Sequence, residues 1–235
     1  MQLSKLESEM YEALRRSSVV VFRIRDLCLL LNFSKIKAYN LVKALKRKKI
    51  IKRVGNGFLS FADVNEFLIA TTINYPSYLS FWTALNYYGF SDQTPNKIFL
   101  ATTKYTKEIN GFKYITVSKN RFFGYTKIGD LVIAEKEKAI IDSLLFPKYS
   151  GGIKEIKRSL QSALKELNYE KLLNYAFKVK NKAVLRRLGF ILESLNYKKD
   201  LKKIKDHIGK GYELLDPGLK RKNNLNKKWL LDVNC

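Results

Sequence analysis

The protein has 235 residues, of which 46% are hydrophobic and 13% aromatic, enough for a folded core and long enough for two domains. Its 45 Lys and Arg outnumber 21 Asp and Glu, giving a formal net charge of +24. The apolar content excludes a disordered chain, and no apolar run approaches the roughly 20 residues that span a bilayer. The charge favours a polyanionic partner, nucleic acid first and an acidic protein or anionic surface second. A general compositional bias toward Lys is the alternative explanation.

The two cysteines and one histidine exclude a disulfide framework and fall short of the four ligands of a typical zinc site. Cys28 lies in an apolar run and is expected in the core, whereas Cys235 ends the chain and is expected to be mobile. The opening residues, "MQLSKLESEM", contain no apolar signal segment. We therefore expect a cytoplasmic protein without a cofactor, metal or membrane partner.

Residues 1–62 predict a compact basic domain, since they hold 14 Lys and Arg against four acids. Its expected elements, in chain order, are a helix over 6–16 with Ser4 as N-cap, a strand over 19–23, a helix over 24–33, a helix over 35–49, and strands over 50–54 and 58–61 around a Gly-Asn-Gly turn. Three helices followed by a hairpin are the plan of a winged helix-turn-helix.

The helix over 35–49 is the candidate recognition helix. Ala38, Leu41, Val42 and Leu45 have the spacing of one apolar face. The other face and the hairpin supply the predicted DNA contacts, namely Ser34, Lys35, Lys37, Tyr39, Asn40, Lys43, Lys52, Arg53 and Asn56. Asn pairs with adenine, Lys reaches guanine, and a Ser at a helix start suits phosphate. Lys46 to Lys49 are expected at the far end of the helix, on phosphate or in water. A solvated Lys-rich face is the alternative.

Residues 63–74 predict a connector helix after an Asp cap, and residues 75–235 a mixed α/β domain with a small sheet and several helices, so the fold class is α+β. The expected elements are an aromatic-rich helix over 76–89, strands over 97–104 and 112–118, a strand pair within 121–134, a helix over 135–147, a turn over 148–152, helices over 153–167, 169–179 and 181–195, and a strand within 228–234. Helical spacing of the aromatic residues favours a core stripe over a base-stacking surface.

No residue combination indicates catalysis. His207 lies in a Lys-rich segment and is expected to be exposed, and the sequence contains neither a P-loop nor a supported nucleophile–base pair. Lys138 and Asp142 stand at i and i+4 and predict an ion pair rather than a metal site. Gly151 and Gly152 precede a helix and fit a turn better than an anion site. We expect a protein that is not an enzyme. A nucleic-acid-processing enzyme is the alternative, while an RNA-binding module lacks its usual signatures.

Five stretches of the C-terminal part have a recognisable order. They are "YLSFWTALNYYGFSDQTPNKIFLATTK", "RFFGY", "VIAEKEKAIIDSLLFPKYSGGI", "KAVLRRLGFILESL" and "GYELLDP". In this order they resemble the AbiEi-type antitoxin family, the transcription-regulating antitoxins of bacterial and archaeal abortive-infection, type IV toxin–antitoxin systems. The resemblance covers nearly the whole chain, with the winged helix matching the family's DNA-binding domain and residues from about 75 its antitoxin domain.

The resemblance implies a repressor that binds double-stranded DNA in its own promoter and counters a nucleotidyltransferase-like toxin in phage defence. It assigns the DNA contacts to Ser34, Lys35, Lys37, Asn40, Lys43 and Arg53. Asp142, Gly151, Gly152 and Arg187 fall inside the family's motifs, where a folding role is as good an assignment as a chemical one. A stand-alone winged-helix regulator without a toxin partner is the alternative, and no feature assigns an oligomeric state.

Overall fold

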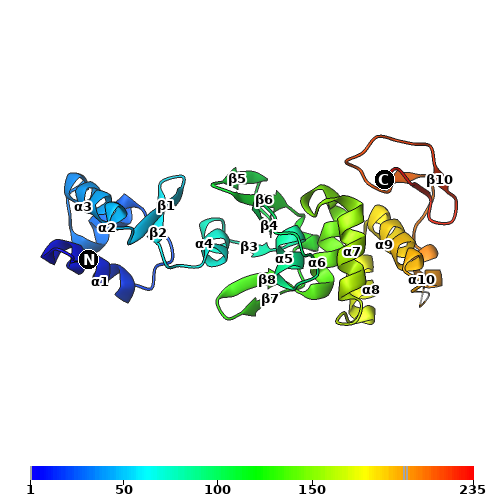
Figure 1. Ribbon diagram of the computed structural model, residues 1–235, viewed down its shortest axis with the longest axis horizontal. Helices are drawn as coiled ribbons and strands as arrows, with labels where there is room; N and C mark the ends of the chain where they lie inside the picture. The colour runs from blue at the N-terminus through cyan, green and yellow to red at the C-terminus, as the bar shows by residue number, and fades with distance from the viewer. Residues whose placement is uncertain (1, 198, 200) are drawn as a thin grey trace.

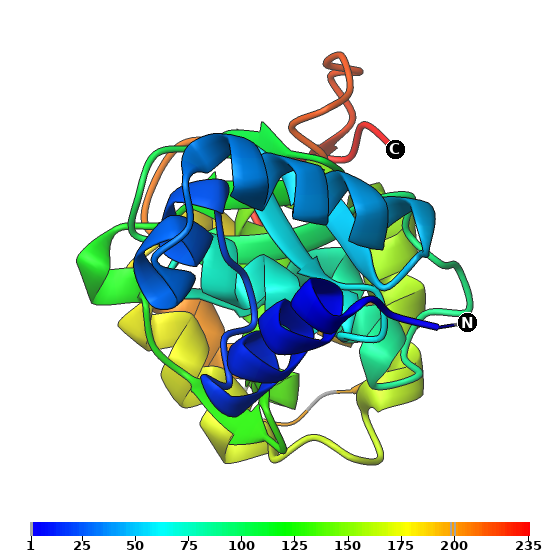
Figure 2. The same ribbon diagram turned by 90° about the vertical axis from the view of Figure 1, so that its left-hand side faces the viewer.

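The computed structural model describes residues 2–197, 199 and 201–235, and it confirms the α+β class. The chain runs along the long axis of the molecule, with the N-terminal helices at one end, a sheet in the middle and further helices beyond it (Figure 1). Viewed from the N-terminal end, the first three helices lie in front of the rest of the chain (Figure 2).

The N-terminal unit has the winged helix-turn-helix arrangement. Its elements are α1 Lys5–Arg16, α2 Ile24–Leu31, α3 Lys35–Arg47, β1 Ile51–Gly55 and β2 Phe58–Phe61. The three helices and the hairpin share one apolar core, to which Met10, Leu14, Leu27, Leu45 and Phe61 contribute almost fully buried side chains. Ser4 caps α1 as expected, in a reciprocal capping box with Glu7.

The prediction of a strand over residues 19–23 is wrong. Only one isolated β-bridge forms there, between Phe22 and Leu59. The next helix explains why the strand stops. The carboxylate of Asp26 accepts a hydrogen bond from the backbone N–H of Arg23 at 2.7 Å, which commits Arg23 to the start of α2.

The connector contains helix α4, Glu66–Ile73. Its N-cap is Asn65, whose side-chain oxygen accepts a hydrogen bond from the N–H of Phe67 at 2.8 Å. The Asp cap expected from the sequence is therefore wrong. The carboxylate of Asp63 instead pairs with Arg15 of α1 at 2.6 Å, so it ties the connector to the winged helix.

A six-stranded mixed sheet forms the centre of the C-terminal domain. Its strands are β3 Ser77–Leu79, β4 Ile98–Thr102, β5 Lys107–Ile109, β6 Phe112–Thr116, β7 Tyr125–Ile128 and β8 Leu131–Ala134, in the order β5-β6-β4-β3-β8-β7. Strand β3 is parallel to β8 and antiparallel to β4, β6 is parallel to β4, and the two edge strands are antiparallel to their neighbours.

The prediction of one continuous helix over residues 76–89 is wrong. Residues Ser77 to Leu79 form β3 in the middle of the sheet, and only Phe81–Tyr87 are helical, as α5. Tyr78 and Leu79 are completely buried, so pairing on both edges overrides the helical spacing of the aromatic residues.

The remaining helices lie on the side of the sheet away from the winged helix (Figure 1). They are α6 Lys136–Leu145, α7 Gly152–Ala163, α8 Tyr169–Lys178, α9 Lys182–Ser194 and α10 Leu201–Lys205, with short 3-10 helices at Lys119–Arg121 and Pro147–Tyr149. A small sheet of β9 Glu213–Leu214, β10 Leu225–Asn226 and β11 Leu231–Asp232 follows, in the order β10-β11-β9. Cys235, expected to be mobile, packs against this domain's core and is partly buried, as is Cys28 beside the N-terminal core.

The hairpin of the winged helix also packs against the C-terminal domain. Val54 and Phe58 join the large C-terminal core rather than the N-terminal one. At Gly55 a Cβ atom would lie 2.9 Å from a methyl carbon of Ile109, so only glycine allows this approach. The orientation of the hairpin is therefore set by both domains. Among the described residues, no helix is long and apolar enough to cross a membrane.

Candidate nucleic-acid interface

Helix α3 is stabilised by a side-chain cap at its N-terminus and by burial of one apolar face. The hydroxyl of Ser34, its predicted N-cap, accepts a hydrogen bond from the backbone N–H of Lys37 at 3.3 Å. The four apolar residues expected on one face, Ala38, Leu41, Val42 and Leu45, are all buried. Since that face is occupied by the core, the opposite face is left to solvent.

The predicted contact residues on α3 are all exposed on that opposite face. They are Ser34, Lys35, Lys37, Tyr39, Asn40 and Lys43. The ammonium of Lys37 lies 3.8 Å from the ring centre of Phe33, a cation–π contact that holds the side chain at the start of the helix. The exposed face therefore presents cations, an amide and a phenol, the side chains that bind phosphates and base edges.

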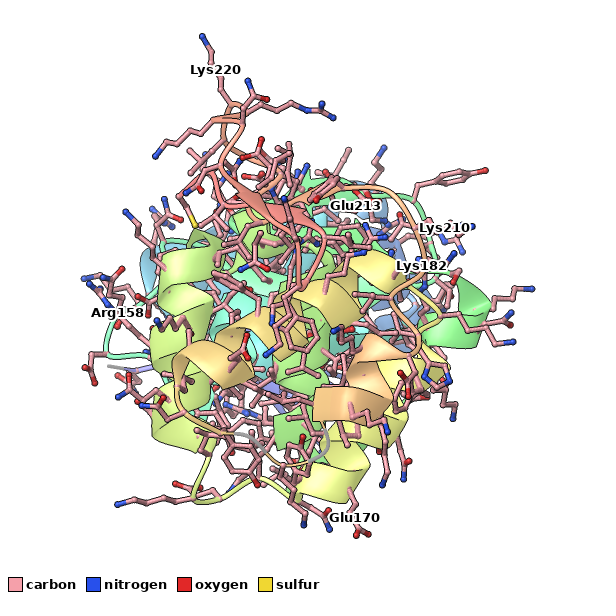
Figure 3. All side chains as sticks on the ribbon, turned by 90° about the vertical axis from the view of Figure 1, so that its right-hand side faces the viewer. Arg158, Glu170, Lys182, Lys210, Glu213 and Lys220 are labelled. Atoms are coloured by element: carbon pink, nitrogen blue, oxygen red, sulfur yellow. The ribbon has the colours of Figure 1, made fainter. Side chains whose placement is uncertain are left out.

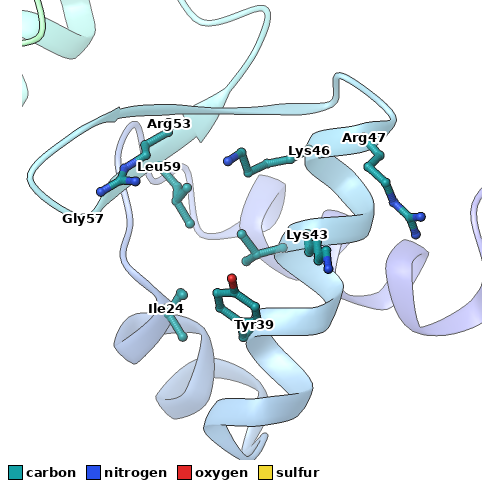
Figure 4. Close-up of a pocket in the computed structure, with 9 residues that line it drawn as sticks. Ile24, Tyr39, Lys43, Lys46, Arg47, Arg53, Gly57 and Leu59 are labelled. Atoms are coloured by element: carbon teal, nitrogen blue, oxygen red, sulfur yellow. The ribbon is translucent and has the colours of Figure 1, made fainter.

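A groove of about 540 Å³ separates α3 from the hairpin. Its lining residues are Ile24, Tyr39, Val42, Lys43, Lys46, Arg47, Arg53, Gly57 and Leu59. Figure 4 shows Lys46 extending from α3 toward the hairpin that carries Arg53, with Arg47 at the edge. Four cations and no acid line the groove in the described chain, so their mutual repulsion is relieved by binding an anion.

The two predicted cations of strand β1 lie on opposite faces of the hairpin. Arg53 is exposed in the groove, whereas Lys52 is partly buried and pairs with Glu66 of α4 at 3.5 Å. Neighbouring strand residues point to opposite faces, so one face of the hairpin meets the groove and the other meets the connector. Asn56 is exposed at the tip of the turn with a φ of 49°. The structure therefore leaves Lys52 outside the groove.

Three further exposed side chains of α3 lie on or beside the predicted surface: Ile36, which the sequence interpretation did not assign, and Lys46 and Arg47, which it expected on phosphate or in water. Ile36 is 77% exposed beside Lys35 and Lys37, where an apolar side chain suits a thymine methyl group. Lys46 and Arg47, expected at the far end of the helix, line the groove because the hairpin folds back against that end. The helical spacing from Lys43 to Lys46 and Arg47 was the signal that indicates this shared face.

Lys48 forms an ion pair within the N-terminal unit. Its ammonium lies 2.7 Å from the carboxylate of Glu7 in α1 and also donates to the carbonyl of Gln2. The hydrogen bond from Lys48, together with the Ser4 backbone N–H, lowers the pKa of Glu7 to about 2. Lys48 therefore fastens the end of α3 to α1 and is not available in the way the sequence suggested.

Asp142 has a folding role. The predicted pair with Lys138 is confirmed, and both side chains are 0% exposed. The carboxylate also accepts hydrogen bonds from the hydroxyls of Ser80 at 2.8 Å and Tyr78 at 3.0 Å. Burial, with the neighbouring Asp142 charge, raises the pKa of Tyr78 well above its usual value, so its hydroxyl stays protonated as a donor. This network joins α6 to β3 and has no solvent access.

Gly151 and Gly152 form the predicted turn. Their φ angles are 73° and 81°, and a Cβ atom on Gly152 would lie 2.8 Å from the carboxylate of Asp216. That carboxylate accepts a hydrogen bond from the N–H of Ile153 at 3.0 Å, so the start of α7 binds an anion of the protein itself.

The metal-ligating residue types do not cluster among the described residues. No group of three His, Cys, Asp or Glu side chains among them has the geometry of a metal site. His207 is exposed as expected, with its Nδ1 2.8 Å from the carbonyl of Lys203. The carboxylate of Glu137, also in α6, accepts a hydrogen bond from the backbone N–H of Asn168 at 2.8 Å.

The fold and this groove define a class, a winged helix-turn-helix unit joined to a mixed α/β domain. Neither a family model nor a curated protein matches the sequence. Among solved structures, the RV2827C protein from Mycobacterium tuberculosis is similar, with a TM-score of 0.71 and 12% identity over 98% of this chain and 92% of that one. At this identity the likeness concerns the fold, which here includes both domains.

Proposed function

We propose that the protein is a DNA-binding transcriptional repressor that acts as the antitoxin of a type IV toxin–antitoxin operon. The observation that carries the DNA-binding half is the groove between α3 and the hairpin, in which four cations meet no acid. A recognition helix with exposed Asn40, Lys35 and Ile36 offers base-reading chemistry at the adjoining turn of α3. The antitoxin half, and the cytoplasmic location that it requires, rest on the resemblance of the C-terminal motifs.

The DNA-binding half is tested by fluorescence anisotropy on the protein's own upstream region and on a shuffled duplex of equal length. We expect the upstream region to bind at least 1,000-fold more tightly, the usual margin of a specific site. Equal affinity for both duplexes would refute the repressor. Charge reversal in K37E/K43E should abolish binding while the melting temperature stays within a few degrees, because both side chains are exposed.

The antitoxin half needs a separate experiment. A neighbouring gene for a nucleotidyltransferase-like protein should be toxic when expressed alone, and co-expression of this chain should restore growth. Repeating the rescue with K37E/K43E separates repression from neutralisation, because the DNA-binding variant retains the C-terminal domain. Toxicity that persists with the wild-type chain present would leave a stand-alone regulator.

A further inference from the structure

A second basic cavity lies in the C-terminal domain, far from α3. It measures about 670 Å³ and opens between the segment after α6, the start of α9 and strand β9. Its charged lining residues in the described chain are Lys148, Lys180, Lys182, Arg187 and Glu213. Figure 3 labels Lys182 and Glu213 on this end of the molecule. Four cations face a single acid, so the cavity has an excess of positive charge.

Arg187 places a charge at the wall of this cavity with little exposure to water. The side chain is 5% exposed. Its guanidinium donates to the carbonyl oxygens of Leu144 and Leu215 at 2.9 Å and Leu214 at 3.1 Å. An arginine has five N–H groups, so two remain, and no described carboxylate lies within 4.0 Å of it. Burial lowers the pKa of Arg187, and the charges of Glu213 and Asp216 oppose this effect only in part. A buried cation whose counter-charges lie beyond contact distance is stabilised further by an anion that reaches it.

The start of helix α9 adds backbone donors to the same cavity. The side-chain oxygen of Asn181 accepts from the N–H of Val184 at 3.1 Å, which satisfies the third helical residue. The N–H groups of Lys182 and Ala183 have no intrahelical acceptor, and both residues line the cavity. Free N–H groups at the positive end of a 13-residue helix favour an anion.

The cavity lining also has an apolar part. Phe146, Pro147 and Pro217 contribute to it. A ligand that fits must combine a multiply charged anionic group with a flat apolar part. The cavity volume lies within the range of small-molecule sites.

We propose that this cavity binds a nucleotide, with its phosphate groups on Lys148, Lys182, Arg187 and the start of α9, and its base against Phe146. The site is separate from the DNA groove, so it does not depend on the proposed repressor function. It also gives Arg187 a role besides its carbonyl contacts, namely to supply the charge that the phosphates neutralise.

Isothermal titration of the full-length chain with ATP, pyrophosphate and adenosine tests the proposal. ATP should bind saturably, pyrophosphate should compete with it, and adenosine should bind at least tenfold more weakly, since it lacks the charged group. K148A/K182A should raise the dissociation constant of ATP at least about tenfold, as two charge-assisted contacts are lost. Both side chains are exposed, so the variant should keep the wild-type melting temperature.

A matched variant, K154A/K165A, removes two exposed lysines from and just beyond α7 and should bind ATP like the wild type. The variant K43A/K46A should also bind ATP normally, which excludes attraction by the DNA groove. No saturable ATP binding up to 1 mM would overturn the proposal. So would an equal loss of affinity in either control variant, or adenosine binding as tight as ATP.

Discussion

The groove beside α3 and the first turns of α6 use positive charge in opposite ways. Lys43, Lys46 and Arg53 line an open groove without an acid, whereas Lys138 is fully buried against Asp142. In the groove no acid of the described lining balances the charge. In α6 the charge is already balanced, and its loss would leave a buried carboxylate alone. Lys content alone therefore does not identify a binding surface, because the partners of each cation decide its role.

Breaking the buried pair should have the largest effect. K138M leaves the Asp142 carboxylate buried without its cation, and we expect the free energy of unfolding to fall by about 3–5 kcal/mol. Urea denaturation followed by circular dichroism measures it. K136A, which removes the exposed pair with Glu166 two residues away, should cost no more than about 1 kcal/mol. Equal losses for the two variants would contradict a structural role of the buried pair.

Removing the groove charge should change DNA binding and not stability. In K43A/K46A/R53A, the slope of log affinity against log salt should decrease in magnitude by up to about 2.7, since each phosphate contact contributes about 0.9. Anisotropy titrations between 50 and 300 mM salt, roughly the range over which such slopes are resolved, provide the slope.

The control for this slope removes three exposed lysines from the C-terminal domain, in K154A/K165A/K202A. The net charge falls equally, but no groove residue is touched. If both triple variants show the same change of slope, the groove has no special part in DNA binding and the whole surface attracts the polyanion.

A smaller effect separates the two faces of the hairpin. R53A should weaken DNA binding by about 1–2 kcal/mol, roughly 5- to 30-fold, because Arg53 lies in the groove. K52A should change affinity less than about twofold, since Lys52 pairs with Glu66 on the other face. Competition binding with one labelled duplex compares them, and a larger loss in K52A would place the contact face of the hairpin on the connector side.

The smallest effect concerns the ion pair that fastens α3 to α1. The folded-state pKa of Glu7 is about 2, below the ordinary value of 4.5, so the ionised form stabilises the folded protein. This contribution is present above pH 4.5 and is lost as the pH falls toward 2. The difference in urea midpoint between wild type and E7Q should therefore shrink over that range. A difference independent of pH would show that the Glu7–Lys48 pair is not its source.

Much of the N-terminal unit was predictable because its signals are local. Ser34 as a cap, the apolar spacing from Ala38 to Leu45 and the Gly-Asn-Gly turn act over a few residues, and the structure confirms α3 and the hairpin at these places. The helical pair of Lys138 and Asp142 is equally local, and it too is confirmed.

The incorrect predictions concern residues whose secondary structure or ion-pair partner depends on segments far away in the sequence. Tyr78 has helical neighbours in the sequence but lies in a strand, because β4 and β8 pair with β3 from both sides. Lys52 and Lys48 belong to the same basic run as Lys43, yet each has an acid from another helix, Glu66 and Glu7. A periodic pattern within one segment does not show which side chain of a distant segment will pack or pair with it.

The sequence by itself determined the α+β class, helix α3 with its exposed face, and the i to i+4 pair of α6, since helix geometry, capping and turn conformation depend on neighbouring residues. Only the tertiary structure decided which cations stay free. Packing of the hairpin on the C-terminal core places Lys46 beside Arg53 in one groove, and the meeting of α6, α9 and β9 encloses Arg187 in another cavity. Both arrangements depend on the burial of apolar surface between segments that are distant in the sequence. The free energy of that burial is gained only when the whole chain folds.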